Sequence, residues 1–378
     1  MGVSVREAHD PKHRRHRDGR EAAADAASLA AEYLYGDVLE SVVERVPAPD
    51  LAAAARVSRE WLRAVRAALR RRPRRLPWLV AHVQEARGGR RRAAAYDPCA
   101  GAWLAVPAPP RHAAPSHPRR PRRAVAPAPA TPRRRTLALA DGEDAAAVEV
   151  HEGGGWTACE PMPDALRDSA SATWLSAAAT DQRVYLVERA TGWASWFDPA
   201  SRRWGPTCRL GPDPAVTTWG VAPGRAGADE RLVLFGAKRA DKGAECTAVV
   251  QAWEVDADTL EPIPSASSDA MPPELSARLF PRDEEEDLDD IDPEPLSIGV
   301  CGNAAGGYVY NAAEPSHGAV LYELREEEEG KAKGAVARWE WVPCAPAVQA
   351  EPLGRAILAC SPVGLDELAL AVGGRGPH

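Results

Sequence analysis

The chain has 378 residues, of which 45% are hydrophobic and 27% charged, and its net charge is −7. This length exceeds one average domain and is ample for a hydrophobic core. No uncharged apolar run approaches the roughly 18 to 20 residues of a membrane helix, and residues 1–20 lack the apolar stretch of a secretory signal. The seven Cys residues stand singly and far apart, which favours a reducing compartment over a disulfide framework. We therefore expect a cytoplasmic or nuclear protein with no membrane contact.

The net charge combines a basic front with an acidic back. Residues 1–140 carry 28 Lys and Arg against 13 Asp and Glu, a net charge of +15, whereas the remainder carries −22. The Arg clusters at 70–75 and 119–135 are compatible with a nuclear-import or nucleic-acid patch, or with solvated segments of a gene rich in G and C. Because no aromatic residue lies between 104 and 155 to stack on bases, nucleic acid is not expected as a partner.

Residues 1–20 are polar and predicted to be disordered, and a helical period runs from residue 21 to residue 72. Asp37 and Glu40 resemble a capping box at the start of a helix. The apolar residues that follow at helical spacing are Val38, Leu39, Val42, Val43 and Val46. Pro47 and Pro49 are expected to end this helix.

Two more short helices are predicted after it. Asp50 can cap one that carries Leu51, and Ser58 can cap another. The apolar face of the latter contains Trp61, Leu62, Val65 and Leu69. Three helices this short bury little by themselves, so they need a further surface to pack on.

After Arg75, short strand-like runs alternate with Gly, Pro and acidic turns, and one unit recurs. The unit is an apolar strand that ends in Asp-Pro, with a Trp several residues later. It is clearest as Tyr96-Asp97-Pro98 with Trp103 and as Phe197-Asp198-Pro199 with Trp204. Weaker copies are Val148-Glu149-Val150 with Trp156, Trp253-Glu254-Val255-Asp256 with Leu260, and Leu321-Tyr322-Glu323-Leu324 with Trp339 or Trp341. Recurrence about every 50 residues is typical of kelch-type propeller blades.

The unit has a physical rationale, because Asp-Pro makes the turn between outer strands and the Trp fills the wedge between twisted blades. Gly373 and Gly374 follow an apolar run that is expected to complete the first blade and close a ring of five or six blades, unless the tail is a separate hairpin. Residues 107–135, 261–295 and 326–329 are predicted to be inserted loops. The residues assigned to blade structure are Tyr96, Asp97, Trp103, Trp156, Phe197, Asp198, Trp204, Trp253, Tyr322, Trp339, Gly373 and Gly374.

The helical part of the chain also resembles a known motif, the F-box. The residues that carry the resemblance are Leu34, Asp37, Val38, Leu39, Val42, Arg45, Val46, Pro47, Asp50 and Leu51, followed by Val57, Ser58, Arg59, Glu60 and Trp61. Together with the propeller repeats, this run makes the chain similar to the plant F-box/kelch-repeat proteins. Tyr35 stands where this family usually has Pro, a departure that could weaken adaptor binding. The resemblance implies an α+β multidomain chain, with an F-box over residues 21–75 and an all-β kelch-type propeller over residues 76–378.

The resemblance further implies a substrate receptor of a Skp–cullin–F-box ubiquitin ligase, which is not itself an enzyme. The F-box would dock on the Skp-family adaptor of the cullin ligase core, and the propeller would hold a protein substrate for ubiquitination and degradation. The layout is most similar to family members that target enzymes of phenylpropanoid and flavonoid synthesis, chalcone synthase among them. The residues expected to bind the adaptor are Leu34, Val38, Leu39, Val42, Val46, Pro47, Leu51, Val57 and Trp61.

Propellers of this kind can also be copper oxidases, which need clustered His with a Tyr or Cys ligand. Only His82, His151 and His317 fall near the predicted blade strands, and they do so singly. The sequence has no CxxC pair and no defensible nucleophile–base arrangement. No catalytic residue, metal or cofactor is therefore expected, and the alternative function is a propeller scaffold that acts outside ubiquitination.

Overall fold

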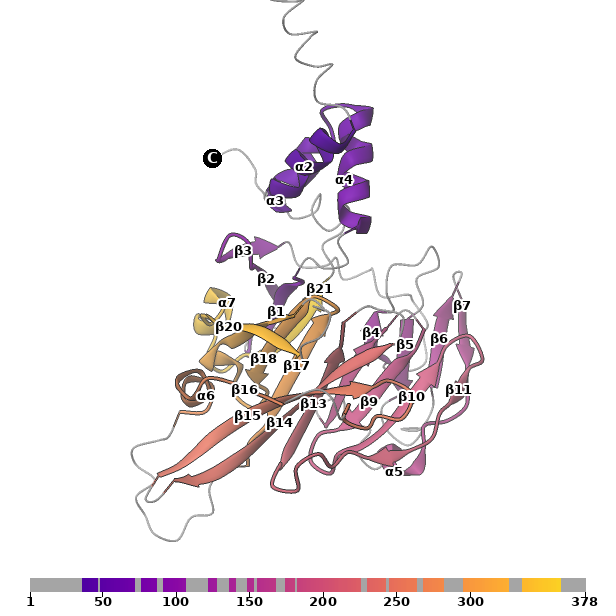
Figure 1. The fold of residues 1–378 in the computed structure, drawn as a ribbon, viewed down its shortest axis with the longest axis vertical. Helices are drawn as coiled ribbons and strands as arrows, with labels where there is room; N and C mark the ends of the chain where they lie inside the picture. Colours follow the sequence, from indigo (N-terminus) through magenta and orange to yellow (C-terminus); the bar gives the residue numbers. More distant parts are fainter. Residues whose placement is uncertain are drawn as a thin grey trace, which may run out of the picture. The chain divides into compact units, whose positions relative to one another are not determined.

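The structure is a computed structural model that describes residues 36–46, 48–71, 76–86, 91–106, 122–127, 136–140, 148–152, 155–167, 174–180, 182–225, 230–242, 245–263, 268–281, 295–325 and 335–361. The chain divides into two units between Arg72 and Pro73, next to the predicted domain boundary after Arg75. The described part of the first, the helical unit (residues 36–71), contains three helices (Figure 1). The described part of the second, the sheet unit (residues 76–361), is mostly β-sheet with a few short helices.

The helices lie where the apolar periodicity predicts them, but the first turns of two of them differ from the prediction. They are α2 (Asp37–Arg45), α3 (Ala48–Ala54) and α4 (Arg59–Arg71). The capping box at Asp37 is not formed, because Gly36 occupies the N-cap and no side chain bonds the first turn. Asp37 and Glu40 instead lie inside that turn, where their negative charges interact favourably with the positive end of the helix dipole.

Helix α3 likewise begins earlier than predicted. Pro49 lies within its first turn instead of ending the preceding helix, and Asp50 follows it inside the helix and not at its cap. Proline fits there because the amides of a first turn have no partner within the helix. Pro47, the other predicted stop, lies outside the described residues, as do the predicted disordered segment 1–20 and residues 21–35.

The described residues of the sheet unit form five antiparallel sheets. The first has the order β21–β1–β2–β3, with strands β21 (Arg355–Ser361), β1 (Trp78–Gln84), β2 (Arg91–Asp97) and β3 (Ala102–Val106). The second has the order β4–β5–β6–β7, with strands β4 (Arg122–Pro127), β5 (Thr136–Ala140), β6 (Val148–Glu152) and β7 (Gly155–Ala158).

The third sheet runs from β8 to β11, and β12 also pairs with β10; its strands are β8 (Leu175–Ala179), β9 (Val184–Glu188), β10 (Trp193–Asp198), β11 (Arg203–Trp204) and β12 (Cys208–Arg209). The fourth comprises β13 (Thr218–Pro223), β14 (Arg231–Lys242), β15 (Glu245–Asp256) and β16 (Asp269–Ala270). The fifth comprises β17 (Ile298–Asn303), β18 (Gly306–Asn311), β19 (Ala319–Leu324) and β20 (Val336–Val342). The short helices are α5 (Asp164–Arg167), α6 (Pro273–Leu279), η1 (Pro315–His317) and α7 (Pro346–Gln349).

From the second sheet to the fifth, and from the fifth to the first, the first strand of one sheet contacts the first strand of the next. These contacts run from β4 to β8, then to β13, to β17 and to β21. Strand β21, near the C-terminal end of the chain, pairs with β1 over its whole length. Successive antiparallel sheets of four or five strands with neighbouring first strands are consistent with a kelch propeller. The closure of a ring and the number of blades stay predictions.

Two of the segments predicted to be inserted loops contain regular structure. The prediction that they are loops throughout was therefore wrong. Strand β4 falls within the predicted loop 107–135 and pairs with β5. Helix α6 and strand β16 fall within the predicted loop 261–295. The helix forms there because its apolar residues recur at helical spacing, so that Leu275 and the fully buried Leu279 pack on the core of the neighbouring sheets.

Candidate functional site

The helical unit buries one set of apolar side chains between its helices. Leu39 and Val43 of α2, Leu51 of α3, and Val65 and Ala68 of α4 are almost completely hidden from solvent. Helix α4 contacts both α2 and α3. Leu39 and Leu51 were predicted to bind an adaptor, but the structure places them in this small core, where they pack against the other helices.

A second set of apolar side chains on the same helices faces solvent. On α2, Val38 is 54% exposed and Val42 is 38% exposed, while Val46, which follows the helix, is half-buried. These three residues recur every four positions, and we call them the apolar stripe. Val57, between α3 and α4, is 65% exposed. Helix α2 is therefore apolar on two adjoining faces, and the described residues of its own unit cover only one of them.

Trp61 lies at the start of α4, where Ser58 fixes the first turn as predicted. The Oγ atom of Ser58 accepts a hydrogen bond from the amide of Trp61 at 3.3 Å and donates one to Glu60 at 3.0 Å. The hydrogen bond at its own backbone amide, and then the one from Ser58, lower the pKa of Glu60. Trp61 is thereby held half-buried, with part of its indole available to a partner.

Helix α4 also presents a basic face that the sequence analysis did not single out as a contact surface. Arg59, Arg63 and Arg66 are exposed and follow one another at helical spacing, with the exposed Arg56 just before the helix. The spacing of these Arg residues in the sequence could have predicted this face. It did not stand out, because Arg is abundant throughout the first 140 residues.

Two residues predicted to bind an adaptor, Leu34 and Pro47, lie outside the described residues, and so does Tyr35. The structure thus brings Val38, Val42, Val46, Val57 and Trp61 to the accessible surface of one unit. It assigns Leu39 and Leu51 to the interior of that unit.

The Asp residues of the recurring unit make the same turn in three sheets of the sheet unit. The Oδ1 atoms of Asp97, Asp198 and Asp256 each accept the amide two residues later, at 2.9, 2.7 and 2.9 Å. The residue four positions after each Asp has a positive φ: 61° at Gly101, 60° at Arg202 and 59° at Leu260. Local side-chain bonding and one left-handed residue therefore define the turn.

Two of these turns, those at Asp97 and Asp198, are followed by a Trp that pairs with an aromatic residue on the neighbouring strand. Trp103 lies opposite Tyr96 with ring centroids 5.5 Å apart, and Trp204 lies opposite Phe197 at 5.2 Å. Each indole Nε1 also donates to a backbone carbonyl beyond the last strand of the adjacent sheet: Trp103 to Pro343 at 2.9 Å and Trp204 to Glu160 at 3.1 Å. The Trp thus links two sheets.

The weaker copies of the unit differ in detail. Trp156 lies opposite His151 on β6, and Trp339 lies opposite the fully buried Tyr322 on β19. Trp253 packs against Trp219 with ring centroids 5.9 Å apart. In that sheet Pro262, and not Leu260, stands opposite Val255, because Leu260 occupies the left-handed position of the turn.

Gly373 and Gly374, with the apolar run before them, lie outside the described residues. The C-terminal segment that pairs with β1 is the earlier strand β21.

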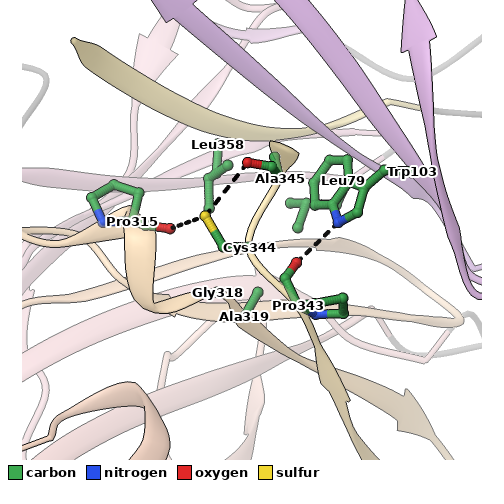
Figure 2. A pocket seen from close by; sticks show the side chains of 9 residues that line it. All are labelled: Leu79, Trp103, Pro315, Gly318, Ala319, Pro343, Cys344, Ala345 and Leu358. Atoms are coloured by element: carbon green, nitrogen blue, oxygen red, sulfur yellow. Dashed lines mark hydrogen bonds between the residues drawn. The ribbon is translucent and has the colours of Figure 1, made fainter. Parts of the chain in front are cut away.

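A small apolar pocket lies where the first and fifth sheets meet (Figure 2). It is too narrow to admit a water molecule, and it is lined by Leu79, Trp103, Pro315, Gly318, Ala319, Pro343, Cys344, Ala345 and Leu358. The Cys344 thiol points at the carbonyls of Pro315 and Ala345, 4.0 and 3.6 Å away. Burial raises the pKa of this thiol, which disfavours the reactive thiolate. The pocket therefore serves packing better than chemistry.

The described residues contain no cluster of three or more His, Cys, Asp or Glu side chains that could hold a metal ion. His317 contacts the carbonyl of Leu279 at 3.2 Å through its Nδ1 atom. Within the same residues, none of the helices is long and apolar enough to cross a membrane.

Comparison with known proteins finds a similar protein whose alignment covers most of the chain. No protein-family model matches the chain. The F-box/kelch-repeat protein At1g23390 of Arabidopsis thaliana is 28% identical to it, over 89% of this chain and 91% of that protein. Among solved structures, dihydro-heme d1 dehydrogenase NirN in complex with DHE aligns with 10% identity and a TM-score of 0.24, over 76% of this chain and 59% of that one, and so weak a likeness carries no argument. The similarity to the Arabidopsis protein extends over both units and supports the plant F-box/kelch-repeat family.

Proposed function

We propose that this protein is a substrate receptor of a Skp–cullin–F-box ubiquitin ligase. The helical unit docks on the Skp-family adaptor, and the cullin ligase core that the adaptor joins carries out the transfer of ubiquitin. The sheet unit holds the protein substrate. The chain itself contributes binding surfaces and no catalytic group.

The observation that carries this proposal is the apolar stripe on α2. Val38 and Val42 face solvent although Leu39 and Val43, on the adjoining face, are buried. Exposed apolar side chains in a row on a short helix mark a surface that a protein partner covers. Val57 and the half-buried Trp61 extend the apolar area to the start of α4. The similarity over most of the chain to a protein named for its F-box and kelch repeats points to the same partner.

The substrate that we propose is an enzyme of phenylpropanoid or flavonoid synthesis, with chalcone synthase as the first candidate. The support is the resemblance in layout between this chain and family members with such targets. Substrate choice in repeat folds resides in the loops that connect the strands. We further propose that the protein acts in the cytoplasm, the nucleus or both.

The docking surface is tested by placing charge on the apolar stripe of the full-length chain. The double variant Val38→Asp/Val42→Asp puts two carboxylates into the proposed interface, where they would be desolvated without partners. We expect it to recover at least about tenfold less adaptor and cullin from plant cells than the wild type. Ser41→Asp is the control for added charge at the edge of the stripe, because Ser41 is exposed on the same helix about 60° from Val38 and 100° from Val42. Equal recovery with all three proteins would contradict the proposal.

The same double variant serves as a substrate trap. It keeps the sheet unit intact but cannot deliver a bound protein to the ligase, so its substrate should accumulate on it. Affinity proteomics under proteasome inhibition should recover phenylpropanoid or flavonoid enzymes with the variant. Consistent recovery of other proteins would replace the proposed substrate while leaving the receptor role in place.

A second function, that of an interaction scaffold outside ubiquitination, is favoured by Tyr35. This residue stands where the family usually has Pro at the start of the motif. Under this alternative, the chain would bind proteins through its sheets and recover no cullin. A Tyr35→Pro variant discriminates the two functions: it should strengthen adaptor capture if the chain is a receptor and leave cullin absent if it is a scaffold.

A further inference from the structure

Strand β21 has a special position in the sheet unit. It enters the first sheet from the C-terminal side of the chain, pairs with β1 on one side, and contacts β17 of the fifth sheet. Two buried tyrosines of the fifth sheet bond across this boundary. The hydroxyl of Tyr308 donates to the carbonyl of Pro77 at 2.7 Å, and that of Tyr310 donates to the carbonyl of Leu358 at 3.2 Å. We call the boundary between these two sheets the seam.

Two cysteines face each other across the seam. Cys301 lies on β17 and Cys360 on β21, and their Sγ atoms are 2.9 Å apart. Both thiols are free, and both side chains are half-buried against the apolar cluster that joins the two sheets. A disulfide has an S–S distance of about 2.0 Å, so a small side-chain adjustment brings the sulfurs to bonding distance. The contact joins positions 59 residues apart.

We propose that Cys301 and Cys360 are a modification site: under oxidising conditions they form a disulfide that staples β21 to β17 across the seam. With hydrogen peroxide as the oxidant, one thiolate attacks the peroxide and becomes a sulfenic acid, while the released oxygen leaves as water. The second thiol then attacks the sulfenic sulfur and expels a second water. Two thiols and one peroxide thus give one disulfide and two waters.

The surroundings of Cys360 determine the rate at which the thiols are oxidised. Burial, followed by the neighbouring Cys301 thiol, raises the pKa of Cys360 well above its ordinary value. The thiolate is the reactive form, so oxidation is slow under mild conditions and needs sustained exposure to the oxidant. The disulfide is therefore expected to form only during prolonged oxidative stress, and the thiols stay reduced in an ordinary reducing compartment.

The staple has a mechanical consequence for the sheet unit. Hydrogen bonds from β1 and contacts with β17 hold β21 in place, and a covalent link would prevent its separation from β17. A cross-link that closes a loop of this size also reduces the freedom of the unfolded chain. We therefore expect the oxidised protein to melt several degrees higher than the reduced protein.

The test uses the full-length protein with and without hydrogen peroxide, followed by alkylation of the remaining thiols and tryptic peptide mass spectrometry. Trypsin places Cys301 alone in the peptide 283–325 and Cys360 alone in the peptide 356–375. The expected result is one cross-linked species of these two peptides that dithiothreitol separates. Alkylation of both cysteines after oxidation, or cross-links to other cysteines, would overturn the proposal.

Cysteine variants connect the link to stability. Cys344→Ser removes another half-buried thiol and should keep both the cross-linked species and the rise in melting temperature. Cys301→Ala and Cys360→Ala should lose both. Because the wild-type peptides alone establish the link, a variant that fails to fold leaves the test intact. A cross-linked wild type that melts no higher than the reduced protein would refute the staple.

Discussion

The indole Nε1 of Trp103 donates a hydrogen bond to the carbonyl oxygen of Pro343 at 2.9 Å, across 240 positions of the chain. Trp204 repeats this bond to Glu160 at 3.1 Å. Both acceptors follow the last strand of the adjacent sheet, β20 in one case and β7 in the other. The Trp of the recurring unit therefore holds neighbouring sheets together through a directional bond as well as through apolar contact.

Trp103→Phe removes this donor while keeping an aromatic ring opposite Tyr96. We expect it to lower the free energy of unfolding by about 1 to 2 kcal/mol, from one lost hydrogen bond and some lost packing. Trp204→Phe should have a similar effect. Urea denaturation measures both, with Trp174→Phe as the control, because Trp174 is 56% exposed. Equal stabilities for all three variants would show that the indole bonds do not stabilise the contact between the sheets.

The left-handed position in the Asp turns predicts that exchanging Gly and a residue with a side chain changes stability differently at two equivalent sites. Gly101→Ala places a Cβ at a φ of 61° and should cost about 1 kcal/mol. Gly211→Ala is the matched control, because an added Cβ there meets no atom within 4 Å and its φ is not in the left-handed region. Arg202→Gly should leave stability nearly unchanged, because relief of strain offsets the greater freedom of the unfolded chain. A loss at Gly211 as large as at Gly101 would contradict this reading of the turn.

The carboxylate of Asp256 predicts how stability responds to acid. The amide of Thr259 is the main cause that lowers its pKa below the ordinary 3.8 in the folded protein. A depressed folded pKa contributes stability above the unfolded value, and this contribution disappears as the pH falls through the folded value. The stability difference between wild type and Asp256→Ala should therefore be constant near neutral pH and shrink below about pH 4.

Asp256→Asn is the control for this experiment, because its amide oxygen can still accept the turn bonds but does not titrate. Its stability should fall less steeply in acid than that of the wild type. Identical acid profiles for the wild type and both variants, measured by thermal unfolding, would exclude a role for this carboxylate.

The helical unit predicts that folding and binding can be separated by mutation. Leu39→Ala leaves a cavity in the small core and should destabilise the unit by about 2 to 4 kcal/mol. Val38→Ala truncates a side chain that is 54% exposed and should cost less than about 0.5 kcal/mol. Helical circular dichroism during thermal unfolding measures both. A stability loss at Val38 that matched the loss at Leu39 would mean that the stripe is part of the core.

Hydrophobic spacing was enough to predict the three helices, and the repeated Asp-Pro unit was enough to predict the recurring turn, because both depend on residues close together in the sequence. The assignment of Leu39 to the core and Val38 to the surface could not be predicted, because both lie on the apolar side of the same helix. That choice depends on where α4 packs. A helical period identifies an apolar face but does not say which neighbour covers it.

Long-range pairing was harder to predict. Strand β4 lies in a segment rich in Arg and Pro, and only its pairing with β5 identifies it as part of a sheet. Pro262 stands opposite Val255 in place of the predicted Leu260, because the turn puts Leu260 at its left-handed position. The pairing of β21 with β1 agrees with the expectation that C-terminal strands join the first sheet, although the predicted strand lay further along the chain.

The central claim is that the apolar stripe of α2 binds the Skp-family adaptor, and its most direct test is calorimetric titration of purified adaptor into the full-length protein. We expect saturable binding by the wild type and by Ser41→Asp. We expect at least about tenfold weaker binding by Val38→Asp/Val42→Asp, at unchanged helical content. Wild-type affinity in the double variant, or no binding by the folded wild type, would contradict the claim.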